Sequence, residues 1–172
     1  SMQKAAVAGL LHDCAKPMKL TQMQAIAKKY RLNLSRATLE SDALLHGPVG
    51  AELARVRYQI NDPDVLNAIR YHTVGRPGMT GLELCVYLAD VIEPGRKAFP
   101  ALNSIRVLAE KSLEEATLKA MLSARDYVLA KGERFCDDSL EAISDLHQKI
   151  TVKRRNRNAR KGFSPQDFKG II

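Results

Sequence analysis

Aromatic residues are scarce in this sequence. Tryptophan is absent, and Phe and Tyr together make up 5% of the chain. Among the apolar residues Leu and Ala dominate over Val, Ile and Thr, a composition that favours packed helices over sheets. The sequence also lacks the alternating pattern of a half-buried strand and any internal repeat. We therefore predict an all-α fold.

Long apolar runs and paired cysteines are lacking as well. No apolar run reaches the length of about 18 residues that a membrane span needs, and we interpret the short apolar stretch near the N-terminus as core and not as a signal peptide. The three cysteines are an odd number without CxxC spacing, which argues against a disulfide scaffold and a zinc ribbon. We expect a cytoplasmic protein in which Cys85, inside an apolar segment, packs as a small hydrophobe.

The positive charge is unevenly distributed. The formal net charge is +8, of which residues 151–172 supply +6, from seven Lys and Arg against the single acid Asp167. We predict one domain over residues 1–150 and a basic tail over residues 151–172. The tail is interpreted first as a flexible, solvated extension and second as a contact for nucleic acid.

Turn signals and apolar spacing divide residues 1–150 into helices. Gly47-Pro48 and Asp62-Pro63 mark two of the starts, because proline is favoured at the first helical position. The segment 81–92 is apolar nearly all round and should form the central, buried helix. The predicted helices cover residues 3–15, 21–31, 47–59, 63–72, 81–92, 103–111, 113–131 and 138–150.

Several histidines and aspartates lie directly beside apolar core sequence. A charged carboxylate in such a run is costly unless it is paired or bound to a metal. One such Asp alone would as readily cap a helix or pair with a core Arg, but several together favour a metal site. Imidazole with carboxylate suits iron, manganese or cobalt better than magnesium. The residues concerned are His12, Asp13, His46, His72 and Asp90.

His147 is different, because it stands on a polar helix and is interpreted as solvated. Cations also lie close to the candidate ligands in the sequence. Arginine forks match phosphate oxygens bidentately, so these cations favour a phosphate substrate. Ordinary surface charge is the alternative, which we accept for Lys97 and leave open for Arg70. The cations concerned are Lys16, Arg70, Arg76, Arg96 and Lys97.

The segments GLLHDCAK, LLHGPVGAELA and AIRYHTVGRPGMTGLELCVYLADVIEPGRKAFP carry a resemblance to a known family. Together with the Leu-Ala-Glu segment 108–110, they resemble the YqeK family of symmetrical diadenosine tetraphosphate hydrolases, over roughly residues 3–147. The resemblance implies an HD-domain helical bundle with a dinuclear metal centre, usually of iron, between core helices. It also implies cleavage of the nucleotide substrate diadenosine tetraphosphate to ADP.

The resemblance implies roles for individual residues. His12 and Asp13 would be metal ligands, with Asp13 bridging two metals. His46 and His72 would bind the second metal, and Asp90 would complete the first. Two overlapping sets would act on the substrate: Asp13, Lys16 and Arg76 in catalysis, and Lys16, Arg76 and Arg96 against the polyphosphate.

One departure from the family pattern concerns the N-terminal side. The family has a further metal-binding His on a helix before the HD segment, and no His precedes His12 here. We therefore expect weak binding of the first metal and low activity, both restored when a natural N-terminal helix with its His is included. Ala6 and Leu10 would otherwise be exposed, and a second chain covering them would give a homodimer.

Two rival functions stay open at this point. One is another HD-type nucleotide phosphohydrolase, such as a nucleotidase or a nucleoside triphosphate hydrolase, since metal ligands do not identify a substrate. The other is a degenerate HD domain that serves as a binding module, with the basic tail contacting RNA. A substrate panel separates the first rival from the main prediction, and the metal content of the protein separates the second.

Overall fold

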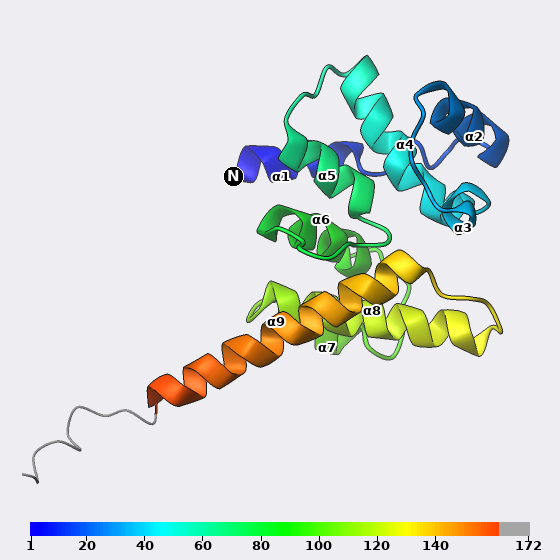
Figure 1. Cartoon of the computed structure of the whole chain (residues 1–172). Coiled ribbons are helices and arrows are strands. Elements are labelled where there is room, and N and C mark those ends of the chain that lie inside the picture. The colour runs from blue at the N-terminus through cyan, green and yellow to red at the C-terminus, as the bar shows by residue number, and fades with distance from the viewer. Residues whose placement is uncertain (162–172) are drawn as a thin grey trace, which may run out of the picture.

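The computed structural model describes residues 1–161 and shows them as helices joined by turns and short loops (Figure 1). No strand occurs in this part of the chain, which confirms the predicted all-α class. The helices are α1 (Met2–Leu11), α2 (Leu20–Lys29), α3 (Arg36–Leu39), α4 (Asp42–Arg57), α5 (Pro63–Tyr71), α6 (Gly81–Ile92), α7 (Leu102–Ala109), α8 (Leu113–Ala130) and α9 (Asp137–Lys161).

Helix α6 lies between two groups of helices (Figure 1). Its Val86 packs with Ile69 of α5 in one apolar cluster, while its Leu88 packs with Met121 of α8 in another. The predicted central position of α6 is therefore confirmed. Cys85, however, is exposed. Its predicted packing in the core is wrong, because it occupies a side of α6 that neither group covers.

Helix α1 ends earlier than predicted. It stops at Leu11 and not near residue 15, and the chain continues in turns closed by hydrogen bonds from Cys14 N to the Leu11 carbonyl (3.1 Å) and from Lys16 N to the Asp13 carbonyl (2.9 Å). His12 and Asp13 therefore follow the helix. His12 is the C-cap of α1 and keeps helical backbone angles (φ −56°, ψ −37°), and Asp13 lies in the turn beyond it.

Helix α4 begins earlier than predicted. It starts at Asp42, and Pro48 lies inside it. Proline lacks the N–H that an interior helical position needs and normally breaks a helix. Here Leu45 and Val49, on either side of Pro48, are fully buried against α2 in an apolar cluster. This packing outweighs the local cost of the proline and keeps one continuous helix.

Helices α4 and α5 approach each other closely at Gly47. A Cβ atom at this position would lie only 2.8 Å from the backbone carbonyl oxygen of Arg70. His46 is the neighbour of Gly47, and His72 follows α5 directly. The absence of a side chain at residue 47 thus lets two predicted metal ligands come together.

Helix α9 crosses the predicted boundary between domain and tail. It runs from Asp137 to Lys161, so residues 151–161 continue a helix that begins within the predicted domain. Residues 162–172, the rest of the predicted tail, lie outside the described residues. The predicted helix ended too early, at residue 150, because the C-terminal half of α9 carries charge in place of an apolar stripe.

The outer side of α1 is apolar and open to solvent. Leu10 is 83% exposed, and Ala6 is exposed beside it, as predicted. A homodimer formed through this side stays a prediction. Across residues 1–161, no helix combines the length and the apolar character that crossing a membrane requires.

Gly47→Ala should lower the free energy of unfolding by about 1–3 kcal/mol, because the new methyl group collides with backbone and α4 must move away from α5. Gly9→Ala is the matched control, since Gly9 is also inside a helix but has no atom within 4 Å of an added Cβ. It should stabilise the protein by about 0.5–1 kcal/mol through helix propensity. Urea unfolding of both variants measures the difference, and equal effects would contradict the close approach at residue 47.

Candidate metal centre

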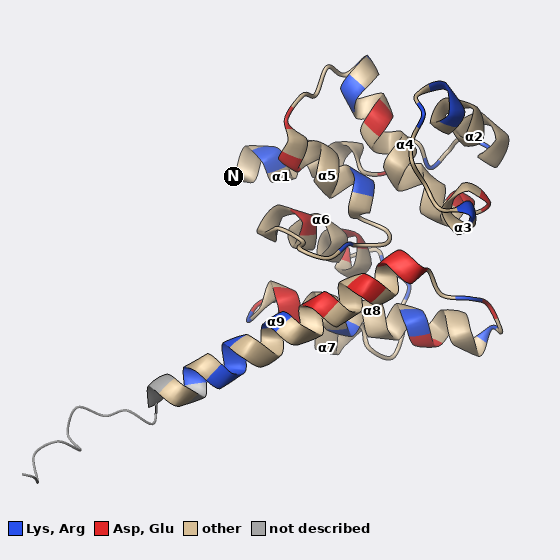
Figure 2. Cartoon of the chain, in the orientation of Figure 1, with Lys and Arg blue, Asp and Glu red and all other residues tan. Residues whose placement is uncertain are grey.

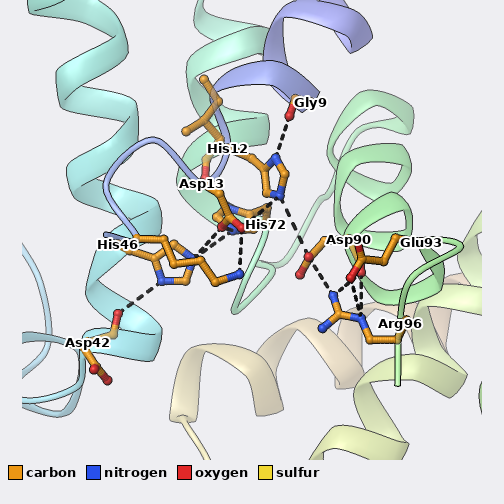
Figure 3. Close-up of polar contacts among 11 residues, drawn as sticks. Gly9, His12, Asp13, Asp42, His46, His72, Asp90, Glu93 and Arg96 are labelled. Carbon is orange, nitrogen blue, oxygen red and sulfur yellow. Dashed lines mark hydrogen bonds and ion pairs between the residues drawn. The ribbon is translucent and has the colours of Figure 1, made fainter. Parts of the chain in front are cut away.

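The predicted ligands come together from four parts of the fold (Figure 3). His12 and Asp13 lie in the turn after α1, His46 in the first half of α4, His72 directly after α5 and Asp90 in the last turn of α6. One ligand atom each from His12, Asp13 and His72 lies within 4.8 Å of the others. The structure thus groups side chains that are up to 78 residues apart in sequence, from His12 to Asp90.

The Asp13 carboxylate lies at the middle of this group. Its Oδ1 is 3.3 Å from His46 Nε2 and 3.5 Å from His72 Nε2. Its Oδ2 is 3.6 Å from His12 Nε2, which in turn lies 3.9 Å from Asp90 Oδ1. The two oxygens of one carboxylate therefore face two different sets of ligands. This is the arrangement that a bridging carboxylate requires.

Backbone carbonyl groups fix the tautomers of the three histidines. A carbonyl oxygen only accepts hydrogen bonds, so a ring Nδ1 beside it carries the hydrogen, and the neutral ring then has a lone pair on Nε2. Partners of this kind orient metal-binding imidazoles in many proteins. The contacts run from His12 Nδ1 to the Gly9 carbonyl (2.6 Å), from His46 Nδ1 to the Asp42 carbonyl (3.2 Å) and from His72 Nδ1 to the Ile69 carbonyl (2.7 Å).

With hydrogen on Nδ1, the Nε2 atoms of His46 and His72 are hydrogen-bond acceptors that face a third acceptor, Asp13 Oδ1. His46 Nε2 and His72 Nε2 are 3.1 Å apart, so in the tautomers that carry hydrogen on Nδ1 their two lone pairs face one another. Asp13 Oδ1 is buried and has no hydrogen-bond partner among the described residues. Buried acceptors left unpaired are costly, and a cation placed among them removes that cost. The donor set therefore fits a metal ion.

The ionisation states of these side chains also favour a bound metal ion. Burial lowers the pKa of His72 to about 4, so this ring is neutral at neutral pH. The His12 ring and the Arg96 guanidinium hold the pKa of Asp90 at about 2. Burial acts to raise the pKa of Asp13, but Lys16 and the neighbouring histidines outweigh it and lower that pKa. The carboxylates are thus ionised and the His72 ring is neutral, which are the forms that bind metals. Asp90 raises the pKa of His12 and favours a proton on this ring, which a bound metal would displace.

A cavity of about 270 Å³ opens beside the ligands, lined by His12, Asp13 and Asp90 together with Lys16. Lys16 Nζ lies 2.7 Å from Asp13 Oδ2. Arg96 donates to the Asp90 backbone carbonyl and, over 2.7 Å, to Asp90 Oδ1. Both cations predicted at these positions therefore contact a ligand carboxylate.

Arg76 lies outside the group of predicted ligands and does not line the cavity beside them, and its phosphate contact stays a prediction. Its guanidinium pairs with both carboxylate oxygens of Glu83, over 2.6 Å and 3.1 Å, and Glu83 is only 1% exposed. Arg76 lines a different cavity, of about 460 Å³, together with Arg70. The pair neutralises the charge of Arg76 and ties the segment after His72 to the start of α6.

The role of Glu83 was not recognised in the sequence, although a signal was present. Thr80 and Glu83 form a capping box: the Glu83 N–H donates to the Thr80 hydroxyl, and the Thr80 N–H donates to the Glu83 carboxylate. The spacing Thr-x-x-Glu before an apolar segment indicates this motif. Its ion pair with Arg76 could not be read from the spacing, because it depends on the path of the loop between them.

The comparison with protein families matches this geometry. A family model described as HD domain matches residues 1–95, which include every predicted ligand. The chain belongs to the HD-domain family.

Relatives of known name place the chain more closely within the HD-domain family. It is 36% identical to a symmetrical bis(5'-nucleosyl)-tetraphosphatase of Halalkalibacterium halodurans, over 84% of this chain and 76% of the relative. It is 37% identical to a protein of the same name in Bacillus subtilis, over 80% of this chain and 73% of the relative. These relatives confirm the family resemblance that the sequence motifs indicated.

A solved structure supports the fold. The crystal structure of an HD superfamily hydrolase from Clostridium acetobutylicum, described as involved in NAD metabolism, superposes with a TM-score of 0.83. The two chains are 37% identical, and the match covers 87% of this chain and 78% of the other.

His46→Ala or His72→Ala should reduce the transition-metal content of the purified protein, because each removes a lone pair from the buried group. His147→Ala is the matched control, since His147 is exposed on α9. Elemental analysis of protein loaded with the same excess of metal gives the number of ions per chain. Equal metal content in all three variants and the wild type would show that His46 and His72 are not ligands.

Proposed function

We propose that this chain hydrolyses diadenosine tetraphosphate symmetrically to two ADP, in a reaction that depends on bound metal ions. The observation that carries the proposal is the buried, unpaired oxygen Asp13 Oδ1, which faces the Nε2 atoms of His46 and His72 and which a cation would stabilise. The names of the relatives that are 36% and 37% identical support the choice of substrate. The proposal rests on both together, since a metal centre by itself does not specify a nucleotide.

The ligands would divide between two metal ions. His12 and Asp90 would hold the first and His46 and His72 the second, with Asp13 shared between them. We infer a transition metal, with iron as the first choice and manganese or cobalt as alternatives, because imidazole and carboxylate suit these ions. When bound, the metal ions supply Lewis acidity and lower the pKa of a bound water to near neutrality.

Lys16 and Arg96 are the residues we assign to the polyphosphate. Lys16 itself lines the cavity where a phosphate would enter, and Arg96 contacts Asp90, which lines the same cavity. The guanidinium of Arg96 can hold two oxygens of one phosphate group. Arg76 does not line this cavity and pairs with Glu83, so we assign it to the connection between α5 and α6.

The leaving group needs little assistance from a general acid. Cleavage between the second and third phosphates releases ADP, whose terminal phosphate has a second pKa of roughly 6. It therefore leaves as a stable anion near neutral pH. Asp13 and Asp90, the carboxylates of the centre, have lowered pKa values and would not donate a proton there.

Diadenosine tetraphosphate should give ADP as the sole nucleotide product of the metal-loaded protein. Ion-exchange chromatography of the reaction separates ADP from AMP and ATP. Chelator-treated protein is the control and should be inactive until metal is returned. Equal amounts of AMP and ATP would contradict symmetrical cleavage, and faster hydrolysis of nucleoside mono- or triphosphates in a substrate panel would favour another HD-type nucleotide phosphohydrolase.

Arg96→Ala should reduce kcat/KM by an amount equivalent to about 2–4 kcal/mol, if the guanidinium stabilises developing charge in the site. Metal content should stay unchanged, since Arg96 offers no lone pair to a metal. Lys97→Ala is the matched control: it removes a neighbouring charge from an exposed side chain. Steady-state kinetics and elemental analysis test both variants. If Arg96→Ala and Lys97→Ala are equally active, Arg96 is only a surface charge.

A further inference from the structure

The C-terminal part of α9 leaves the helical body as a basic arm, comprising residues 152–161 (Figures 1 and 2). Packing against the body ends at Ile150, which is 7% exposed. Every described side chain from Val152 to Arg157 is exposed. At 1.5 Å per helical residue the basic arm is about 15 Å long. It is therefore a helix that contributes almost no apolar surface to the core.

The basic arm carries positive charge alone. It contains no Asp or Glu, and its cations are Lys153, Arg154, Arg155, Arg157, Arg160 and Lys161. Lys153 and Arg154, nearest to the body, pair with Glu114 and Glu115 of α8 over 2.5 Å and 3.1 Å. Arg155 and Arg157 have no ion pair among the described residues. Carboxylates of α8 therefore compensate the charge of Lys153 and Arg154, whereas the charge of Arg155 and Arg157 is uncompensated among the described residues.

A hollow of about 240 Å³ lies where the basic arm meets the start of α8. Arg157 lines it from the arm, and Lys111 lines it from the body. Lys111 also has no ion pair within the described part of the chain. Glu114 and Glu115 also line the hollow, and each pairs with a cation at the base of the arm. Lys111 and Arg157 therefore leave a positive excess on one concave surface, which suits an extended anion that runs from the body along the arm.

Like charges repel along the basic arm. Arg157 lies four residues after Lys153 and three after Arg154, and helical residues at these spacings are neighbours, so like charges there destabilise the helix. No apolar packing compensates for this repulsion beyond Ile150. A bound polyanion would remove the repulsion and release counterions at the same time.

We propose that the basic arm, with Lys111 beside it, is a binding surface for structured RNA. Arginine prevails over lysine in the arm, and a guanidinium can both bind a phosphate bidentately and stack on an exposed base. RNA loops offer phosphates and unstacked bases together, whereas duplex DNA keeps its bases stacked. The only apolar residues of the arm are Val152 and Ala159. A helix without large apolar side chains lacks the face that inserts into a lipid surface.

The experiment measures binding of a fluorescein-labelled RNA stem-loop to the full chain by anisotropy, over a series of salt concentrations. Arg155→Gln/Arg157→Gln should weaken binding at least tenfold at about 0.1 M salt and reduce the slope of log affinity against log salt by about 1.4 to 1.8. Lys28→Gln/Lys29→Gln is the matched control, because it removes the same charge from exposed positions of α2. It should bind like the wild type.

Hydrolysis of diadenosine tetraphosphate should be unchanged in both double variants, since neither touches the metal centre, so loss of RNA binding is distinguishable from a failure of the proposed function. Equal weakening in the two variants would overturn the proposal, because it would show attraction by net charge alone. Equally tight binding of a duplex DNA of the same length, or of phosphatidylserine vesicles, would also overturn it, in favour of a general anion surface.

Discussion

A carboxylate oxygen without a hydrogen-bond donor lies where α1, α4, α5 and α6 meet. Asp13 Oδ1 faces the Nε2 atoms of His46 and His72, and the Nδ1 atom of each ring lies against a backbone carbonyl. Such a group is unstable by itself, because its members repel one another and water does not reach all of them. Three features of the fold nevertheless bring these atoms to within 3.5 Å of one another. They are the turn after α1, the close approach of α4 and α5 at Gly47, and the end of α5.

The choice of backbone carbonyls as partners for the histidines has a chemical advantage. A carboxylate partner could take up a proton and change the ring tautomer with pH, whereas a carbonyl at a fixed place in a helix does not titrate. Each of the three rings is held by a carbonyl three or four residues earlier in the chain. The orientation of the ligands is therefore set by local helical geometry and does not depend on distant side chains.

The sequence indicated the residues that the structure groups around Asp13, because polar residues in apolar surroundings are conspicuous. It predicted α5 from the Asp62-Pro63 start and α6 from a segment that is apolar nearly all round. Three features could not be predicted. Pro48 suggested a helix start, yet buried Leu45 and Val49 carry α4 through it. Arg76 stood among the ligand motifs, yet its pairing with Glu83 depends on how the loop between them folds. The C-terminal end of α9 could not be predicted, because a charged helix without an apolar stripe has the same sequence pattern as a solvated tail.

Helix α6 joins two apolar clusters and also carries Asp90 of the candidate metal centre, and because the helix is rigid these two roles are coupled. Its Val86 belongs to the cluster with α1 and α5, its Leu88 belongs to the cluster with α7, α8 and α9, and Asp90 on the same helix reaches the metal centre. Helices α7, α8 and α9 contribute none of the proposed ligands themselves. Any ion that holds Asp90 in place nevertheless restrains α6, and through it the whole second cluster. By thermodynamic linkage, substitutions in the core of α8 would then alter affinity at a centre that α8 does not contact.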